Sequence, residues 1–154
     1  MFRSKKLYRA LALSVGLIGL AACADTPPPP APMAATDGPQ LAGAWYQVYF
    51  ATDSTEINPR GQMIIQTVAN VVKQDNLVRV TIIGKTDSVG SPSANNVLSQ
   101  NRADKIRDAL ISHAVPADRI ATNWTGEGKQ EMVTANNVSE QRNRVVDIAV
   151  QRPF

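Results

Sequence analysis

The segment from Gly84 to Ala103 contains the side chains best placed to do chemistry. Asp87 follows the end of an apolar stretch, on a turn rich in serine and glycine. Turns at strand ends, beside the start of a helix, are where α/β sheets bind ligands. Arg102 falls within an apolar arc at helical spacing, formed by Leu98, Ile106, Ala109 and Leu110. A guanidinium in such an arc is costly unless it is paired. Arg102 therefore binds a ligand, forms a buried ion pair with an aspartate, or extends its charged end to solvent.

Alternating strands and helices are predicted to position these side chains. Apolar and β-branched residues predict strands over residues 45–50, 78–82, 119–124 and 144–150. A helix is predicted to begin at Asn58-Pro59, which form a good N-cap and first-turn pair, and a second helix covers about 93–113. Residues 126–140 are polar and predict a loop. The order βαβαβ–loop–β indicates an α/β domain of about 110 residues, large enough to fold alone.

Residues 1–22 have the pattern of a secretory leader peptide. The start is basic, an apolar stretch runs from Ala10 to Leu20, and small residues follow. A helix of that length rises about 16 Å, short of the ~30 Å hydrocarbon core of a bilayer, so it is not predicted to span one. The stretch ends in Leu20-Ala21-Ala22-Cys23, which resembles the lipobox of bacterial lipoproteins. We therefore predict that Cys23, the only cysteine, is acylated and becomes the first residue of the mature protein.

The residues after Cys23 predict a lipid-anchored tether. Ala24 stands next to it, and by resemblance to sorted lipoproteins the absence of Asp there favours the periplasmic face of the outer membrane. Residues 23–43 are rich in proline and alanine, a composition that cannot bury a core. Twenty such residues in polyproline II conformation reach roughly 60 Å. The folded domain is predicted to occupy residues 44–154.

The charge distribution argues against nucleic acid as a partner. Residues 1–22 contain four of the 16 basic residues and none of the 13 acidic ones, so the formal charge falls from +3 to −1 without them. Only 5% of the residues are aromatic, which leaves few surfaces for stacking bases. A nearly neutral chain has no electrostatic basis for binding a polyanion.

The residue types do not assemble into a catalytic set. The one histidine, His113, lies near the predicted end of the second helix, where it suits the helix dipole. The run Gly126 to Lys129 lacks the spacing of a phosphate-binding loop, and Asp53 with Asp87 would suit a glycosidase only at a separation that sequence does not specify. An acylated Cys23 leaves no thiolate for a metal site or a nucleophile. We therefore predict a protein that is not an enzyme and has no cofactor or metal.

Three short motifs follow one another through the folded part. They are Gly84-x-Thr86-Asp87, then Asn95-x-x-Leu98-Ser99-x-x-Arg102-Ala103, then Asn143-Arg144-x-Val146-Asp147-Ile148. Together they resemble the OmpA-like (OmpA/MotB) peptidoglycan-binding domain, over about residues 48–150. That family includes peptidoglycan-associated lipoproteins, which have the same layout of lipobox, linker and domain. The resemblance implies a two-layer α/β (α+β) sandwich of order βαβαββ, in which a mixed four-stranded sheet packs against helices.

The resemblance also implies a ligand and the residues that bind it. Family members bind the free amino-acid end of meso-diaminopimelate in the peptidoglycan stem peptide, a group with one ammonium and one carboxylate. Asp87 matches the position that binds the ammonium, and Arg102 the position whose fork binds the carboxylate. Thr86 and Asn95 match positions that flank the pocket. Arg144 matches a position that is either a ligand contact or a structural ion-pair partner.

Four residues depart from the family pattern. Lys85 stands where the family usually has histidine, which is expected to add a positive charge beside the site. Ala51 replaces an acid after the first strand, Ala94 an aromatic residue, and Val145 a second arginine. None of these changes removes the aspartate or the arginine on which binding is expected to depend.

These observations predict a non-catalytic outer-membrane lipoprotein that ties the membrane to peptidoglycan by binding diaminopimelate. The alternative is a degenerate OmpA-like module that acts mainly by binding periplasmic or other envelope proteins. If the wall is the ligand, Asp87→Ala and Arg102→Ala are each expected to abolish binding to isolated cell wall and to leave the fold intact.

Overall fold

The computed structural model describes residues 43–153. The predicted leader, the acylation site Cys23 and the tether up to residue 42 lie outside the described residues. Within residues 43–153, no helix combines the length and the hydropathy needed to cross a membrane.

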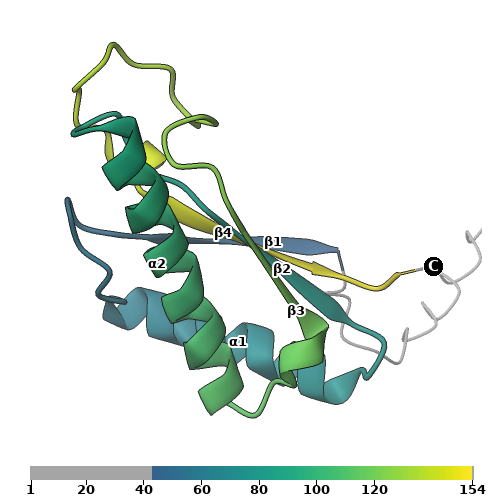
Figure 1. Cartoon of the computed structure of the whole chain (residues 1–154). Helices are drawn as coiled ribbons and strands as arrows, with labels where there is room; N and C mark the ends of the chain where they lie inside the picture. Colours follow the sequence, from purple (N-terminus) through teal and green to yellow (C-terminus); the bar gives the residue numbers. More distant parts are fainter. Residues whose placement is uncertain (1–42, 154) are drawn as a thin grey trace, which may run out of the picture. The chain divides into compact units, whose positions relative to one another are not determined.

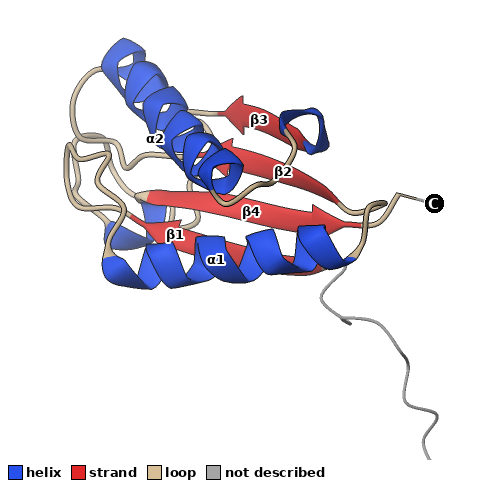
Figure 2. Ribbon diagram, turned by 90° about the horizontal axis from the view of Figure 1, so that it is seen from below, coloured by secondary structure: helices blue, strands red, loops and turns tan. Residues whose placement is uncertain are grey.

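Four strands form a single mixed sheet behind two helices (Figure 1). Their spatial order is β1 (Ala44–Tyr49), β4 (Val145–Gln151), β2 (Arg79–Gly84) and β3 (Ile120–Trp124). Strand β4 is antiparallel to both of its neighbours, whereas β2 and β3 are parallel. Helices α1 (Pro59–Gln74) and α2 (Pro92–Ser112) cover one face of the sheet (Figure 2), and two single-turn 3₁₀ helices, Ala117–Arg119 and Gln141–Asn143, precede β3 and β4. The predicted α/β sandwich of order βαβαββ is confirmed.

Each long helix begins at a capping residue followed by proline. The Asn58 side chain accepts a hydrogen bond from the Gly61 N–H at 2.8 Å, and Ser91 accepts one from the Ala94 N–H at 3.2 Å. These side chains satisfy N–H groups that have no partner within the helix, and the following proline is preorganised for the first turn. The sequence therefore determines where both helices start.

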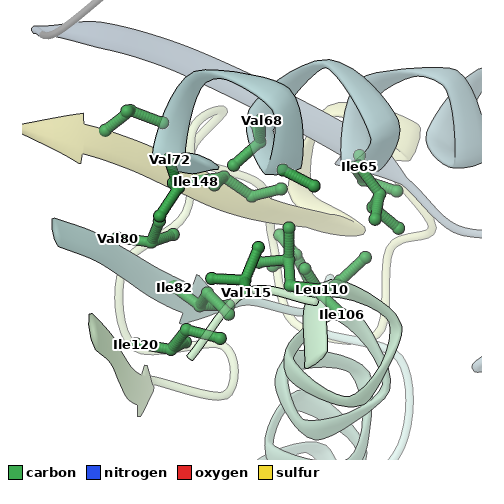
Figure 3. Packing of buried hydrophobic residues seen from close by; sticks show 14 of the residues in the cluster. Ile65, Val68, Val72, Val80, Ile82, Ile106, Leu110, Val115, Ile120 and Ile148 are labelled. Atoms are coloured by element: carbon green, nitrogen blue, oxygen red, sulfur yellow. The ribbon is translucent and has the colours of Figure 1, made fainter. Parts of the chain in front are cut away.

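The core lies between the helices and the sheet (Figure 3). Alternate strand residues face the helices, as strand periodicity requires, and α1 and α2 each add one apolar face. The labelled members of this core are Ile65, Val68, Val72, Val80, Ile82, Ile106, Leu110, Val115, Ile120 and Ile148. All of the buried apolar cluster lies within residues 48–150, so the domain has a core of its own.

Candidate functional site

The end of β2 packs directly against helix α2 at a glycine. A Cβ atom on Gly84 would overlap the main-chain carbonyl oxygen of Ser99. No other residue type fits this contact without moving the helix. The close approach holds α2 beside residues 85–90, the turn that follows β2, so that Arg102 and Asp87 belong to the same end of the sheet.

A cavity of about 250 Å³ opens between this turn, the start of α2 and the residues after β1. Its lining includes Asp53, Asp87, Gly90, Asn95 and Leu98. Both of the charged residues that line it are aspartates, so the cavity favours a cationic group. Leu98, which the helical pattern places with the apolar arc, is only partly buried and lines the cavity, whereas the other three members of that arc contribute to the core.

Asp87 is almost fully buried, and one of its two oxygens carries all of its hydrogen bonds. Its Oδ2 accepts from Arg144 Nη1 at 2.9 Å, from the Glu140 N–H at 3.3 Å and from the Ser139 hydroxyl at 3.4 Å. Within residues 43–153, Oδ1 has no hydrogen-bond partner. The carboxylate is therefore held in place from one side and keeps an acceptor for a further group.

Arg102 is completely buried and tied to the main chain rather than to an acid. Its guanidinium donates to the carbonyls of Ser54 (2.8 Å), Ala51 (2.9 Å) and Lys85 (3.3 Å). It also lies over the Phe50 ring, 5.2 Å from the ring centroid, which is a cation–π arrangement. Burial lowers the pKa of Arg102 to about 10, so the side chain stays charged at neutral pH.

Three of the five guanidinium N–H donors of Arg102 are used in this way. One N–H on Nη1 and one on Nη2 have no acceptor among the described residues. These two remaining donors suit a planar, two-oxygen acceptor such as a carboxylate.

The structure shows which arginine pairs with Asp87. Of the three possibilities for Arg102, a buried ion pair with an aspartate is not formed within residues 43–153: the salt-bridge partner of Asp87 is Arg144. Arg144 also donates to the Phe50 carbonyl at 3.2 Å and to Ser139 at 2.9 Å. Arg144 is therefore a structural ion-pair partner, and it is hydrogen-bonded to Asp87, the residue predicted to bind the ligand ammonium.

Of the other two predicted site residues, Asn95 lines the cavity and Thr86 does not. Asn95 is buried, and its amide donates to Glu127 at 2.6 Å. Thr86 is also buried, and its hydroxyl has no hydrogen-bond partner among the described residues. An unpaired buried hydroxyl is costly, which marks Thr86 as a position where a bound group or water is needed.

Lys85 does not add the expected positive charge to the site. Its ammonium forms a salt bridge with Asp147 at 2.7 Å and another with Glu131. Burial opposes the charged form, but the hydrogen bonds with Asp147 and Glu131 outweigh it and raise the pKa of Lys85 above its ordinary value. The expectation is wrong because the ammonium of Lys85 pairs with Asp147 and Glu131, which compensate its charge, whereas Asp87 lies in the turn after β2 and pairs with Arg144.

Sequence reasoning missed the residues that complete the site. Ser139 and Glu140 come from the loop 126–140, whose polar composition carries no signal of what it contacts. The carbonyls of Ala51 and Ser54 are main-chain groups, which no side-chain pattern identifies. Groups of three or more potential metal-binding side chains are absent from the described part of the chain.

Comparison with known proteins shows the family of the chain. Residues 49–145, more than half of the chain, match the OmpA family. The chain belongs to the OmpA family.

Three curated relatives cover much of this chain. The probable lipoprotein YiaD of Escherichia coli is 37% identical over 105 residues, which are 67% of this chain and 47% of that protein. Outer membrane protein A of Yersinia pseudotuberculosis is 32% identical over 82% of this chain and 35% of its own length. The peptidoglycan-binding protein ArfA of Mycobacterium bovis is 36% identical over 67% of this chain and 32% of its length. The chain therefore spans less than half of each of these relatives.

A solved structure covers nearly the same region. The peptidoglycan-associated lipoprotein from Burkholderia pseudomallei is 28% identical, with a TM-score of 0.64 over 68% of this chain and 89% of that one. The OmpA-like domain of FopA1 from Francisella tularensis, at 22% identity and a TM-score of 0.62, has the same fold. The mixed sheet with two helices is thus the OmpA-like fold.

Proposed function

We propose that this chain is a non-catalytic lipoprotein that ties the outer membrane to peptidoglycan by binding the diaminopimelate of a stem peptide. The observation that carries the proposal is a pair of oppositely charged groups at one end of the sheet that both keep unused hydrogen-bonding capacity: Asp87, which lines the cavity, and the buried Arg102. Asp87 keeps one carboxylate oxygen without a partner, and Arg102 keeps two N–H donors. The names of two relatives, one peptidoglycan-binding and one peptidoglycan-associated, support the same ligand.

In the proposed binding mode the two oxygens of Asp87 have different partners. The ligand ammonium binds Oδ1, while Arg144 remains on Oδ2 and keeps the carboxylate in position. The ligand carboxylate accepts the remaining Nη1 and Nη2 donors of Arg102, as a charge-assisted pair of hydrogen bonds. Thr86 and Asn95 flank the bound group and supply neutral hydrogen bonds, and the unpaired hydroxyl of Thr86 gains a partner.

Co-sedimentation with purified cell-wall sacculi tests the proposal, with free diaminopimelate as competitor. The protein is expected to pellet with the sacculi, and the competitor is expected to release it. A folded protein that stays in the supernatant would overturn wall binding, and would leave the protein-binding alternative as the function to pursue.

Two conservative variants locate the binding. Asp87→Asn and Arg102→Lys are expected to abolish the competable pelleting. The first removes the negative charge that binds the ammonium, and the second removes the planar fork that binds the carboxylate. Asp108→Asn and Arg107→Lys make the same chemical changes at more exposed positions of α2 and are expected to pellet like the unmodified chain. Equal pelleting of all four variants would place the binding surface elsewhere.

A further inference from the structure

Strand β1 forms an outer edge of the sheet and has none of the usual protection. It pairs with β4 on one side only, and within residues 43–153 no strand pairs with its other side (Figure 2). Edge strands in monomers are normally blunted by charged residues, proline or a bulge, because unpaired main-chain groups recruit other strands. The six residues of β1, Ala-Trp-Tyr-Gln-Val-Tyr, include no charge and no proline.

The register with β4 shows which main-chain groups point outward. Phe50 stands opposite Arg144, and its N–H donates to the Arg144 carbonyl at 2.9 Å. In an antiparallel pair, hydrogen-bonded positions recur at every second residue. The even-numbered residues of β1 therefore bond to β4, and the main-chain groups of Trp45, Gln47 and Tyr49 face the open edge. The Tyr49 carbonyl accepts from the Asn58 side chain at 3.0 Å, as an outward-facing group can.

Two side chains along this edge also lack the contacts that their types usually make. Trp45 is 61% exposed, although burial of an indole is among the most favourable contacts available to a side chain. The Tyr46 hydroxyl is buried without a hydrogen-bond partner among the described residues. A cavity of about 770 Å³ runs along the edge. It is lined by four residues of β1, by Arg60 and Ile64 of α1, and by the salt-bridged Lys85, Glu131 and Asp147.

We propose that this edge pairs with β1 of a second copy of the chain, antiparallel and centred on Gln47. In this register Gln47 lies opposite its own counterpart, and Trp45 lies opposite the second copy's Tyr49 at both ends. The outward-facing main-chain groups then pair across the two copies, and the Tyr49 carbonyl accepts a second hydrogen bond beside that of Asn58. The two aromatic pairs lie on the same face of a continuous eight-stranded sheet.

Self-complementarity favours a second copy over another strand. A two-fold interface brings each residue type near itself or its mirror position, so any charge on β1 would face a like charge. The strand has none. A shift by one residue would turn the side chains to opposite faces, and a shift by two would lose both aromatic pairs, so a single register is preferred. This inference is independent of the proposed wall binding.

A single introduced cysteine tests the register directly. The full chain with Cys23→Ser has no thiol, so Gln47→Cys in that background provides the only one. Residues directly opposite each other in a hydrogen-bonded antiparallel pair have Cα atoms about 5.5 Å apart, within the range for a disulfide. Mild oxidation is expected to convert the Gln47→Cys chain mainly to a covalent dimer.

Two further cysteines serve as matched controls. Tyr49→Cys lies on the same strand but opposite Trp45, and Asn123→Cys is exposed on the other edge strand, β3. Both are expected to remain largely uncrosslinked. A monomeric Gln47→Cys chain, or equal crosslinking of all three, would overturn the proposal, because the first excludes the contact and the second indicates random collision.

A charged residue introduced into β1 tests the dimer without an added cysteine. The unmodified full chain in detergent is expected to show a concentration-dependent dimer by sedimentation velocity, and Trp45→Lys is expected to be monomeric with an unchanged circular dichroism spectrum. A folded Trp45→Lys protein with the same dimer dissociation constant as the unmodified chain would contradict pairing through β1.

Discussion

At the scale of single residues, Arg102 connects the stability of the domain with its proposed ligand. The guanidinium binds the carbonyls of Ala51 and Ser54, which follow β1, and that of Lys85, which follows β2. It therefore holds together the ends of two strands that are not neighbours in the sheet. Buried carbonyls deprived of donors are costly, and so the same side chain supports the walls of the cavity.

This geometry corrects the expectation that Arg102→Ala leaves the fold intact. Removal of the guanidinium leaves three carbonyls without their donor and opens a hole in the core, so the free energy of unfolding is expected to fall by about 3 kcal/mol or more. Urea denaturation measures the loss, with Arg107→Ala, on a more exposed part of α2, as the control. Equal stability of the two variants would contradict a supporting role for Arg102.

At the scale of elements, successive residues at the end of β2 face opposite sides of the sheet and make different contacts. Gly84 and Thr86 belong to the helix side, whereas Lys85 belongs to the other side and binds Asp147 of β4. Three successive residues thus serve helix packing, the ion pair and the site. The close approach of α2 and the salt bridge of Lys85 each make a separate prediction.

Substitution of the glycine is expected to disturb the site through the helix. The Gly84→Ala methyl group has no space beside the Ser99 carbonyl, so α2 must move away from the sheet. We expect a loss of about 2 kcal/mol in stability and weaker sacculus binding, although no ligand contact is removed. Urea denaturation and co-sedimentation check the two effects, and an unchanged Gly84→Ala protein would show that the packing at this point is loose.

The salt bridge of Lys85 predicts a pH dependence. Because the folded state raises the pKa of Lys85 above 10.5, its contribution to stability is complete below pH 10.5 and is lost as the pH rises through the folded pKa. At pH 7 Lys85→Met is expected to be less stable by about 3 kcal/mol, because Asp147 and Glu131 lose their counter-charge.

Urea denaturation of both proteins from pH 7 to 11.5 measures this difference. The difference is expected to narrow above pH 10.5, where Lys85 loses its proton in the unfolded chain, and to narrow further until the pH passes the folded pKa, where the lysine is neutral in both states. A difference that stays constant across this range would mean that packing of the lysine stem, rather than its charge, is responsible.

At the scale of the whole molecule, the proposed function needs two attachments on one chain. The described domain offers the candidate wall site, and the proposed membrane attachment is through Cys23, which lies outside the described residues. Several acyl chains on one cysteine make a stable anchor, because each buried CH₂ contributes about 0.8 kcal/mol, whereas one chain alone is marginal.

Loss of the proposed acylation site is expected to release the protein from the membrane. Cys23→Ser removes the thiol without changing the domain, so the chain is expected to move from the outer-membrane fraction to the soluble fraction and to lose incorporation of labelled palmitate. Cell fractionation with immunoblotting checks the location. An unchanged distribution of the Cys23→Ser chain would contradict the lipid anchor, and sacculus binding in vitro would be unaffected in either case.

The sequence by itself determined the elements and the polarity of the site. Apolar periodicity and the Asn58-Pro59 pair predicted the four strands, the second helix and the start of the first helix to within one or two residues, because these signals are local. The apolar arc around Arg102 left three alternatives open for its guanidinium, and the structure excludes extension to solvent because none of that residue is exposed. The position of Asp87 after an apolar strand predicted its place at a sheet end.

Only the tertiary structure decided which charges meet. Asp87 pairs with Arg144, 57 residues away, and Lys85 pairs with Asp147 instead of facing the cavity. These contacts exist because β4 lies between β1 and β2, which brings the start of β4 beside the end of β2. Strand order is set by packing of the whole core, and a local pattern in the sequence carries no record of it.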